Sequence, residues 1–187
     1  MKIVLASSSP RRRELLKTAG VSFETDVEGV EEIPQGDTAE EIVCSLACQK
    51  CRPVAARRPE DCVIGADTVV VLDGDVLGKP ADEKEACRML RSLSGREHEV
   101  YTGVCISKDG KEYVFSERTS VKFFELTDEE IYTYVKTGEP MDKAGAYGIQ
   151  GLGCALVEGI NGDYFNVVGL PVAKTVRKLR EVAEKAD

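Results

Sequence analysis

The sequence has a single histidine, His98, among its 187 residues. A zinc site built on several histidines is therefore excluded, and a Ser–His–Asp triad could only use His98. We expect this residue to be a polar lining side chain at the start of a strand. The chain also has no uninterrupted apolar run of about 18 residues, so we expect no membrane-spanning helix. Internal repeats, low-complexity tracts and linkers are missing too, which favours one domain over residues 1–187.

Positive charge is in the minority, because 25 lysine and arginine residues face 33 aspartate and glutamate residues, a net charge of −8. Nucleic-acid binding needs a broad basic face, so we expect no nucleic-acid partner. A signal-peptide pattern is missing, since the first apolar run has only about five residues. The seven cysteines, an odd number, then indicate reduced thiols in the cytoplasm.

Strand and helix signals alternate along the chain. Pro10 suits the first turn of a helix, and capping boxes at 38–41 and 127–130 begin two more. The continuous β-branched run 62–72 predicts a central strand buried on both faces. We also expect strands at 3–6, 21–26, 100–107 and 112–124, helices at 82–93 and 171–185, a turn at 159–162, and strand, turn and helix over 162–171. The pattern predicts an α/β domain with a mixed sheet.

A basic turn follows the first strand, with arginines at positions 11, 12 and 13. Cations oppose the helix dipole at a helix N-terminus, so three of them there are unfavourable. A bound polyanion such as a triphosphate would relieve the conflict, because the free N–H groups of the first turn attract anions. The alternative is a solvated basic turn.

Three further polar segments do not fit a purely structural role. Asp67 and Thr68 lie within the most hydrophobic strand, where burying a carboxylate costs several kcal/mol unless it is paired, bound to metal or at a cleft. The alternative is an aspartate at a strand end, bonded to backbone. Lys79 lies in a tight turn. Residues 141–153 include Lys143, Gln150 and four glycines, which allow close approach of backbone to a ligand. This loop matches neither a GxGxxG fingerprint nor a P-loop.

Cys44, Cys48 and Cys51 have the C-x3-C-x2-C spacing of radical S-adenosylmethionine enzymes. Here the three positions fall on one face of a well-capped helix, as expected of small buried residues. The remaining cysteines, at 62, 87, 105 and 154, lie in apolar runs. We therefore expect the cysteines to pack in the core rather than to hold an iron–sulfur cluster.

Taken together, several segments resemble the Maf (septum formation inhibitor) family of nucleoside triphosphate pyrophosphatases. The resemblance covers essentially the whole chain, in order, and is most specific in the block DKAGAYGIQG at 142–151. One departure is Cys51, where the family pattern has alanine after the lysine that is Lys50 here. The segments that carry the resemblance are 6–16, 65–68, 78–80, 93–98, 101–103, 139–151 and 162–171.

The resemblance implies a long mixed β-sheet flanked by helices, with two lobes around a deep cleft, as in inosine triphosphate pyrophosphatases. It also implies hydrolysis of nucleoside triphosphates to the monophosphate and pyrophosphate, a house-cleaning of nucleotide pools with a link to cell-division arrest. Mg²⁺ or Mn²⁺ is the implied cofactor, and a homodimer is a common assembly in such proteins. The alternative is a nucleotide-sensing binding protein that acts on septum formation through protein partners.

The resemblance also assigns roles to residues. Asp67 is the implied catalytic proton acceptor, and Glu32 with Asp67 would hold the metal, although Asp67 could serve mainly as a ligand. Arg11, Thr68 and Gln150 together match the dTTP/UTP branch of the family, and an amide such as Gln150 can bond two adjacent groups of a uracil-type base. The residues expected to bind substrate are Ser9, Arg11, Arg12, Lys50, Thr68, Lys79, Lys143 and Gln150.

Overall fold

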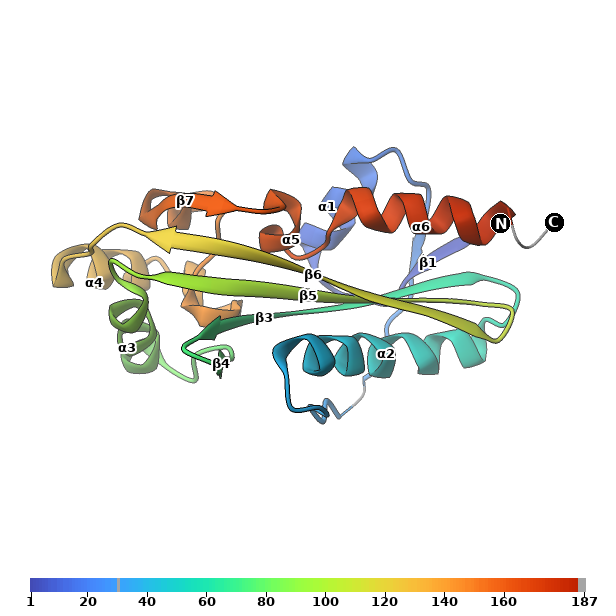
Figure 1. Ribbon diagram of the computed structural model, residues 1–187, viewed down its shortest axis with the longest axis horizontal. Coiled ribbons are helices and arrows are strands. Elements are labelled where there is room, and N and C mark those ends of the chain that lie inside the picture. Colours follow the sequence, from blue (N-terminus) through green and yellow to red (C-terminus); the bar gives the residue numbers. More distant parts are fainter. Residues whose placement is uncertain (30, 185–187) are drawn as a thin grey trace. The chain divides into compact units, whose positions relative to one another are not determined.

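The computed structural model describes residues 1–29 and 31–184 and confirms an α/β fold with a mixed sheet flanked by helices (Figure 1). The strands are β1 Ile3–Leu5, β2 Glu24–Thr25, β3 Cys62–Leu72, β4 Asp75–Leu77, β5 Glu97–Lys108, β6 Lys111–Phe123 and β7 Val157–Asn161. The α-helices are α1 Pro10–Thr18, α2 Ala39–Arg57, α3 Glu83–Leu93, α4 Asp128–Lys136, α5 Tyr164–Val168 and α6 Val172–Glu184. Three 3₁₀ helices lie between α4 and β7: η1 Glu139–Asp142, η2 Ala144–Ala146 and η3 Gly151–Leu156.

The strand order in the sheet is β2-β1-β3-β5-β6-β7, with β4 paired to β3. Strand β1 runs parallel to both β2 and β3, whereas β4 is antiparallel to β3 and β7 is antiparallel to β6. Strand β3 is buried along nearly its whole length, as its unbroken apolar run predicts. The mixed character of the sheet therefore agrees with the alternation of strands and helices in the sequence.

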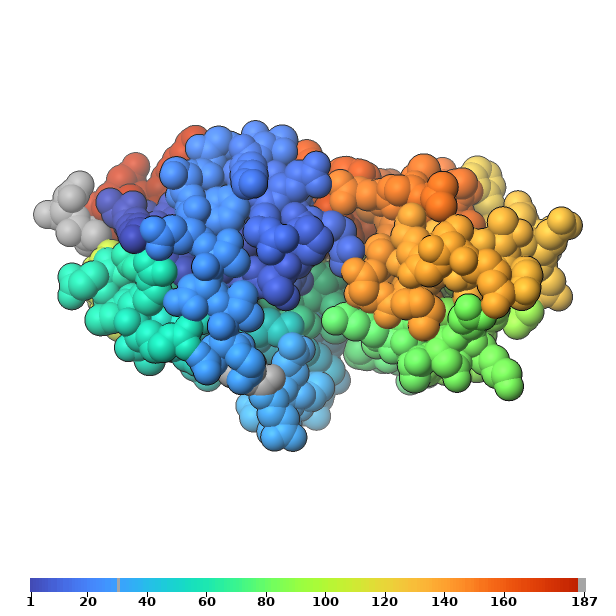
Figure 2. All heavy atoms as spheres, turned by 180° about the vertical axis from the view of Figure 1, so that it is seen from behind, coloured from blue at the N-terminus to red at the C-terminus, as the bar shows by residue number. Residues whose placement is uncertain are grey.

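Contacts divide the chain into two compact units. The first comprises Met1–Thr68, Thr102–Glu117 and Gly169–Asp187, and the second Val69–Tyr101 and Arg118–Val168. In the first unit, α2 and α6 cover opposite faces of the strands (Figure 1). In the second, α3 packs against η1 and η2. In Figure 2 the green spheres of α3 lie next to the orange spheres of η1 and η2. The single domain over 1–187 and the deep cleft stay predictions.

Local sequence signals correctly predict where three helices begin and where one hairpin turns. The hydroxyls of Thr38 and Thr127 each accept from a backbone N–H of the first turn, while the glutamate three residues later bonds back to the cap. Asp82 caps α3, as expected. Asp109 and Gly110 both have positive φ, of 50° and 73°, which matches the tight turn between β5 and β6.

Four expectations about elements were wrong. The predicted strand 21–26 shrinks to the two residues of β2. Strand β4 was not expected, because three residues show no periodicity and the strand depends on its pairing with β3. Residues 159–161 belong to β7 rather than to a turn. Over 162–171 the chain forms helix α5 and no strand, since the side-chain amide of Asn166 ties the helix to Val100 O and Thr119 Oγ1 at 3.0 and 2.9 Å. The predicted helix end at residue 185 lies outside the described residues.

Helix α2 lies directly on the backbone of two strands. A Cβ atom on Gly65 of β3 would be 2.4 Å from the carbonyl oxygen of Ala47, and one on Gly103 of β5 would be 2.3 Å from that of Val43. Only glycine permits such an approach. The position of α2 against the sheet is thus set by two residues without side chains.

His98 belongs to the core of the second unit and does not line a polar surface, so that expectation was wrong. The residue is 2% exposed, and its ring contacts the edges or faces of Phe123 and Tyr147. Its Nε2 atom lies 2.7 Å from the Tyr147 hydroxyl. Burial lowers the pKa of His98 to about 4, although the charge of Glu97 opposes the shift.

The cysteines mostly pack as predicted, because those at 48, 51, 62 and 105 are buried. Cys154 is exposed on η3, so its predicted core position was wrong. Among the described residues, no helix has the length and apolar character needed to cross a bilayer.

Candidate active site

The junction of β1 and α1 presents a helix N-terminus without acidic residues in its first turn. Ser9 is the N-cap, and its hydroxyl accepts from the backbone N–H of Arg12 at 3.4 Å. The Ser7 hydroxyl accepts from the N–H of Ser9 at 3.2 Å. The remaining N–H groups and the positive end of the helix dipole favour an anion at this position.

Arg12 is held inside the first unit and does not belong to a solvated basic turn. Its Nε donates to the carbonyl of Gly169 at 2.8 Å, Nη1 to the Ser7 hydroxyl at 3.3 Å, and Nη2 to the Thr68 hydroxyl at 3.1 Å. Burial lowers the pKa of Arg12, while the charge of Asp67 raises it. The guanidinium is therefore fixed in orientation close to Asp67.

Lys50 brings the two predicted metal ligands together. Its ammonium contacts the carboxylate of Asp67 and lies 3.1 Å from a carboxylate oxygen of Glu32. The side chains of Lys50 and Asp67 are only 19% and 13% exposed, whereas that of Glu32 is 50% exposed. Asp67 thus has a charged partner, and the alternative of a strand-end aspartate bonded to backbone does not hold.

Thr68 follows Asp67 in β3 and links it to the arginine. Its hydroxyl accepts from Arg12 and lies 2.8 Å from the hydroxyl of Thr102 in β5. Arg11 is half-buried in the first turn of α1, and its charge acts on Arg12. Three predicted substrate residues of the first unit, Arg12, Lys50 and Thr68, therefore lie together with the carboxylates of Asp67 and Glu32.

The other three predicted residues lie in the second unit. Lys79 is exposed, and Gln150 is half-buried with extended backbone just before η3. The ammonium of Lys143 contacts the carbonyl of Glu139 and lies 2.6 Å from the Asp142 carboxylate. The structure thus shows how Lys143 is held, and the joint action of the three residues on a ligand stays a prediction.

Sequence reasoning missed the residue that organises the glycine-rich loop. The Glu139 carboxylate accepts from the backbone N–H groups of Leu152 and Gly153 at 2.9 and 3.0 Å and from the Tyr134 hydroxyl at 2.9 Å. These bonds lower the pKa of Glu139 against the opposing effect of burial. Ser7 and Thr102 were also missed as partners of Arg12 and Thr68, because the contacts that bring these hydroxyls close are made by the fold.

The first unit offers oxygen ligands that suit a hard divalent cation. The carboxylates of Glu32 and Asp67 converge on a single ammonium, so both can face one small ion. Mg²⁺ usually binds one or two carboxylates together with substrate phosphates and water, and Mn²⁺ accepts the same ligands. The residues therefore fit the predicted metal.

Comparison with known proteins identifies relatives over nearly the entire chain. The family model described as Maf-like protein matches residues 2–182. A dTTP/UTP pyrophosphatase of Bacillus cereus is 54% identical over 181 residues, which cover 96% of this chain and 95% of the relative. A protein of the same name from Bacillus thuringiensis subsp. konkukian shows the same identity and coverage.

Similarity to solved structures is weaker. The Ham1 protein of Staphylococcus aureus is 17% identical, with a TM-score of 0.49 over 66% of this chain and 72% of that one. The assignment to a family therefore depends on the sequence.

Proposed function

This chain belongs to the Maf-like protein family, and we propose that it hydrolyses nucleoside triphosphates, with dTTP and UTP preferred, to the monophosphate and pyrophosphate. Two relatives that are 54% identical carry the name dTTP/UTP pyrophosphatase. The structural observation that carries the proposal is the contact of Lys50 with Asp67 and Glu32, close to the fixed guanidinium of Arg12. Hydrolysis of a triphosphate needs cations that offset the charge of the phosphates and carboxylates that hold a metal and orient water.

In the proposed reaction, a water molecule adds to the α-phosphorus and the bond to the bridging oxygen of pyrophosphate breaks. Asp67 accepts the proton of that water at a carboxylate oxygen, and Lys50 holds the carboxylate in place. Arg12 and Lys50 offset the negative charge of the phosphates. Three of the five N–H groups of Arg12 already have protein acceptors, which keeps the guanidinium in one orientation.

We propose that Glu32 and Asp67 hold Mg²⁺ or Mn²⁺. When bound, such an ion lowers the pKa of a coordinated water and offsets phosphate charge. Asp67 then combines two roles, ligand and proton acceptor. If it is mainly a ligand, a variant without its charge should recover activity at high metal concentration; a lost proton acceptor is not restored in this way.

Base selection is proposed to depend on Gln150, with Arg11 and Thr68 near the phosphates. The amide of Gln150 offers a donor and an acceptor to the pairing edge of a uracil-type base, and the wrong base leaves these groups unpaired. The Thr68 hydroxyl is already engaged by Arg12 and Thr102. We therefore propose that Thr68 acts by positioning Arg12, while Ser9, Lys79 and Lys143 contact the triphosphate.

We also propose that the enzyme is located in the cytoplasm, that it forms a homodimer and that nucleic acid is not one of its partners. Light scattering coupled to size-exclusion chromatography measures the assembly directly.

The test of the function is a panel of nucleoside triphosphates assayed for pyrophosphate release with and without Mg²⁺ or Mn²⁺. We expect metal-dependent release with the highest kcat/KM for dTTP and UTP. Preference for GTP or ITP would contradict the substrate assignment alone. Nucleotide binding without any release would contradict the enzyme and support the nucleotide-sensing alternative.

A further inference from the structure

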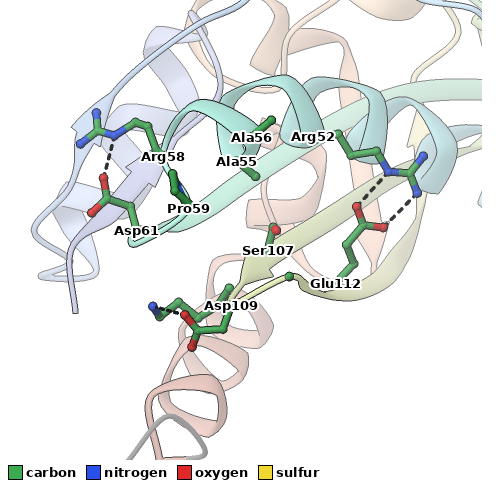
Figure 3. Close-up of a pocket in the computed structure, with 11 residues that line it drawn as sticks. Arg52, Ala55, Ala56, Arg58, Pro59, Asp61, Ser107, Asp109 and Glu112 are labelled. Atoms are coloured by element: carbon green, nitrogen blue, oxygen red, sulfur yellow. Dashed lines mark hydrogen bonds and ion pairs between the residues drawn. The ribbon is translucent and has the colours of Figure 1, made fainter.

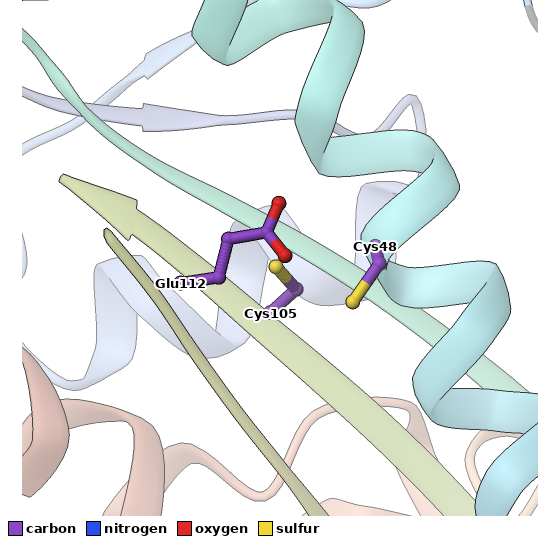
Figure 4. Close-up of side chains that lie close together, drawn as sticks. All are labelled: Cys48, Cys105 and Glu112. Carbon is purple, nitrogen blue, oxygen red and sulfur yellow. The ribbon is translucent and has the colours of Figure 1, made fainter. Parts of the chain in front are cut away.

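A cluster of sulfur and oxygen ligands lies in the first unit and has no part in the proposed catalysis. The Sγ atoms of Cys48 in α2 and Cys105 in β5 and a carboxylate oxygen of Glu112 in β6 are all within 4.8 Å of one another. Figure 4 shows the three side chains pointing toward one another from these elements. Both thiols are buried, at 6% and 0% exposure, whereas Glu112 reaches solvent.

Glu112 is held in this orientation by a charged partner. Arg52 donates from Nε and Nη2 to the two carboxylate oxygens at 2.8 and 2.9 Å. Each oxygen keeps a further lone pair for another ligand. Partners of this kind orient metal ligands in known sites. Arg52 follows Cys48 by one helical turn, so α2 supplies both the thiol and the residue that orients the carboxylate.

We propose that Cys48, Cys105 and Glu112 bind a soft divalent cation of the zinc type. Zn²⁺ accepts cysteine sulfur and carboxylate oxygen in tetrahedral sites, with a fourth position for water or another ligand. Binding replaces two S–H bonds by two metal–sulfur bonds and releases two protons to solvent, without any change of oxidation state. Two thiolates, Glu112, Arg52 and the ion then sum to zero charge, which a largely buried cluster requires.

Cys51 lies next to this cluster without belonging to it. It lies one turn after Cys48 on the buried face of α2, and its thiol donates to the carbonyl of Val63 at 3.4 Å. It also interacts with Cys105. Because this thiol is engaged by Val63, the fourth position of the ion is left to water or another ligand.

One ligand of the cluster, Glu112, borders a hollow on the surface. A hollow of about 270 Å³ is lined by Arg52 and Glu112 and by the turn between β5 and β6, including Ser107 and Asp109 (Figure 3). The carboxylate of Glu112 thus borders the hollow and lies within 4.8 Å of both thiols. This position lets Glu112 act as the first ligand that an entering ion meets.

Packing of the cysteines in the core is the simpler interpretation, and it makes a different prediction. Metal ions bind cysteine as the thiolate, and an ordinary cysteine thiol is mostly protonated at neutral pH. Metal binding must therefore release protons and weaken as pH falls. Cysteines that only pack would show neither metal uptake nor proton release.

The test is titration of the reduced full-length protein with Co²⁺, whose thiolate-to-metal charge-transfer absorption reports sulfur ligation. We expect this absorption at one equivalent, its displacement by Zn²⁺, and its loss in Cys48→Ser and Cys105→Ser. Cys154→Ser, at an exposed position of the second unit, is the control and should bind as the unaltered protein does. Absence of the band, or its persistence in the double serine variant, would overturn the proposal.

Glu112→Gln provides a second variant at a partly exposed position. It should keep the sulfur band and lower the Co²⁺ affinity by about tenfold or more. Glu117 lies on the same strand, β6, and forms an ion pair with Lys174 of α6. The variant Glu117→Gln removes that ion pair and is the matched control. Equal affinities of the two variants would contradict a role for Glu112. Loss of two hydrogens without metal uptake, with the peptides of Cys48 and Cys105 found linked by mass spectrometry, would instead assign these two cysteines to a disulfide. Because the band reports sulfur ligation, its outcome is independent of pyrophosphate release.

Discussion

The ammonium of Lys50 contacts the carboxylate of Asp67, which lies inside the most apolar strand of the chain, and Glu32 shares the same ammonium. A carboxylate as buried as Asp67 is costly unless it has a charged partner. The pair therefore explains how a carboxylate can occupy the middle of β3.

Replacing Asp67 by asparagine keeps the size of the side chain and removes its basicity. We expect the turnover of dTTP to fall by about 10²–10⁴-fold, because a positioned general base contributes on this scale. Steady-state kinetics measures the effect, and circular dichroism shows that the variant is folded. Near-normal turnover would remove Asp67 from the mechanism.

Glu32→Gln should affect the metal more than the chemistry. Its side chain is half exposed, so the fold tolerates the change. We expect the concentration of Mg²⁺ needed for half-maximal activity to rise on the order of tenfold, since a charged ligand is lost. The neighbouring exposed Glu31→Gln is the control and should leave the metal dependence unchanged. An equal rise in both variants would point to general surface charge.

Gln150→Ala should lower selectivity rather than catalysis in general. We expect kcat/KM for dTTP and UTP to drop roughly tenfold to a hundredfold, because polar groups of the base lose their partner. The value for GTP in the same variant is the internal reference. A parallel loss for GTP and dTTP would show that Gln150 supports the loop and does not read the base.

His98 should make the fold sensitive to acid. Its pKa is about 4 in the folded protein and near 6.5 in the unfolded chain, so between these values the unfolded chain takes up the proton. The free energy of unfolding should fall by about 3 kcal/mol between pH 7 and pH 4 through this group. Urea unfolding of the protein and of His98→Asn separates this part from the carboxylates. The same decline in both proteins would contradict the assignment.

Local signals in the sequence were sufficient for the helix starts. The threonine caps at 38 and 127 and the Asp109–Gly110 turn lie where the sequence predicts them, because each depends on residues within a few positions. Strand β4 was not predicted, and the strand expected within 162–171 does not form, since pairing with β3 and the bonds of Asn166 come from distant segments. His98 was misplaced for the same reason.

The candidate site shows the same division. Resemblance grouped Glu32, Lys50 and Asp67, and the structure brings them together. The bond from Arg12 to the carbonyl of Gly169 could not be predicted, because a backbone acceptor can belong to any residue and leaves no mark in the sequence. The same holds for Glu139, whose partners are mostly backbone N–H groups.

The close approach of α2 to the strands has a consequence for the site. Val43 and Ala47 are one helical turn apart and lie against Gly103 and Gly65, so the helix meets the sheet at two fixed points. Two such points prevent α2 from both rolling and sliding, and Lys50 follows Ala47 by less than one further turn. A methyl group added at either glycine would therefore displace the ammonium as well as the helix. The alignment of Lys50 with Asp67 therefore depends on Gly65 and Gly103, the two residues that let the helix approach the sheet.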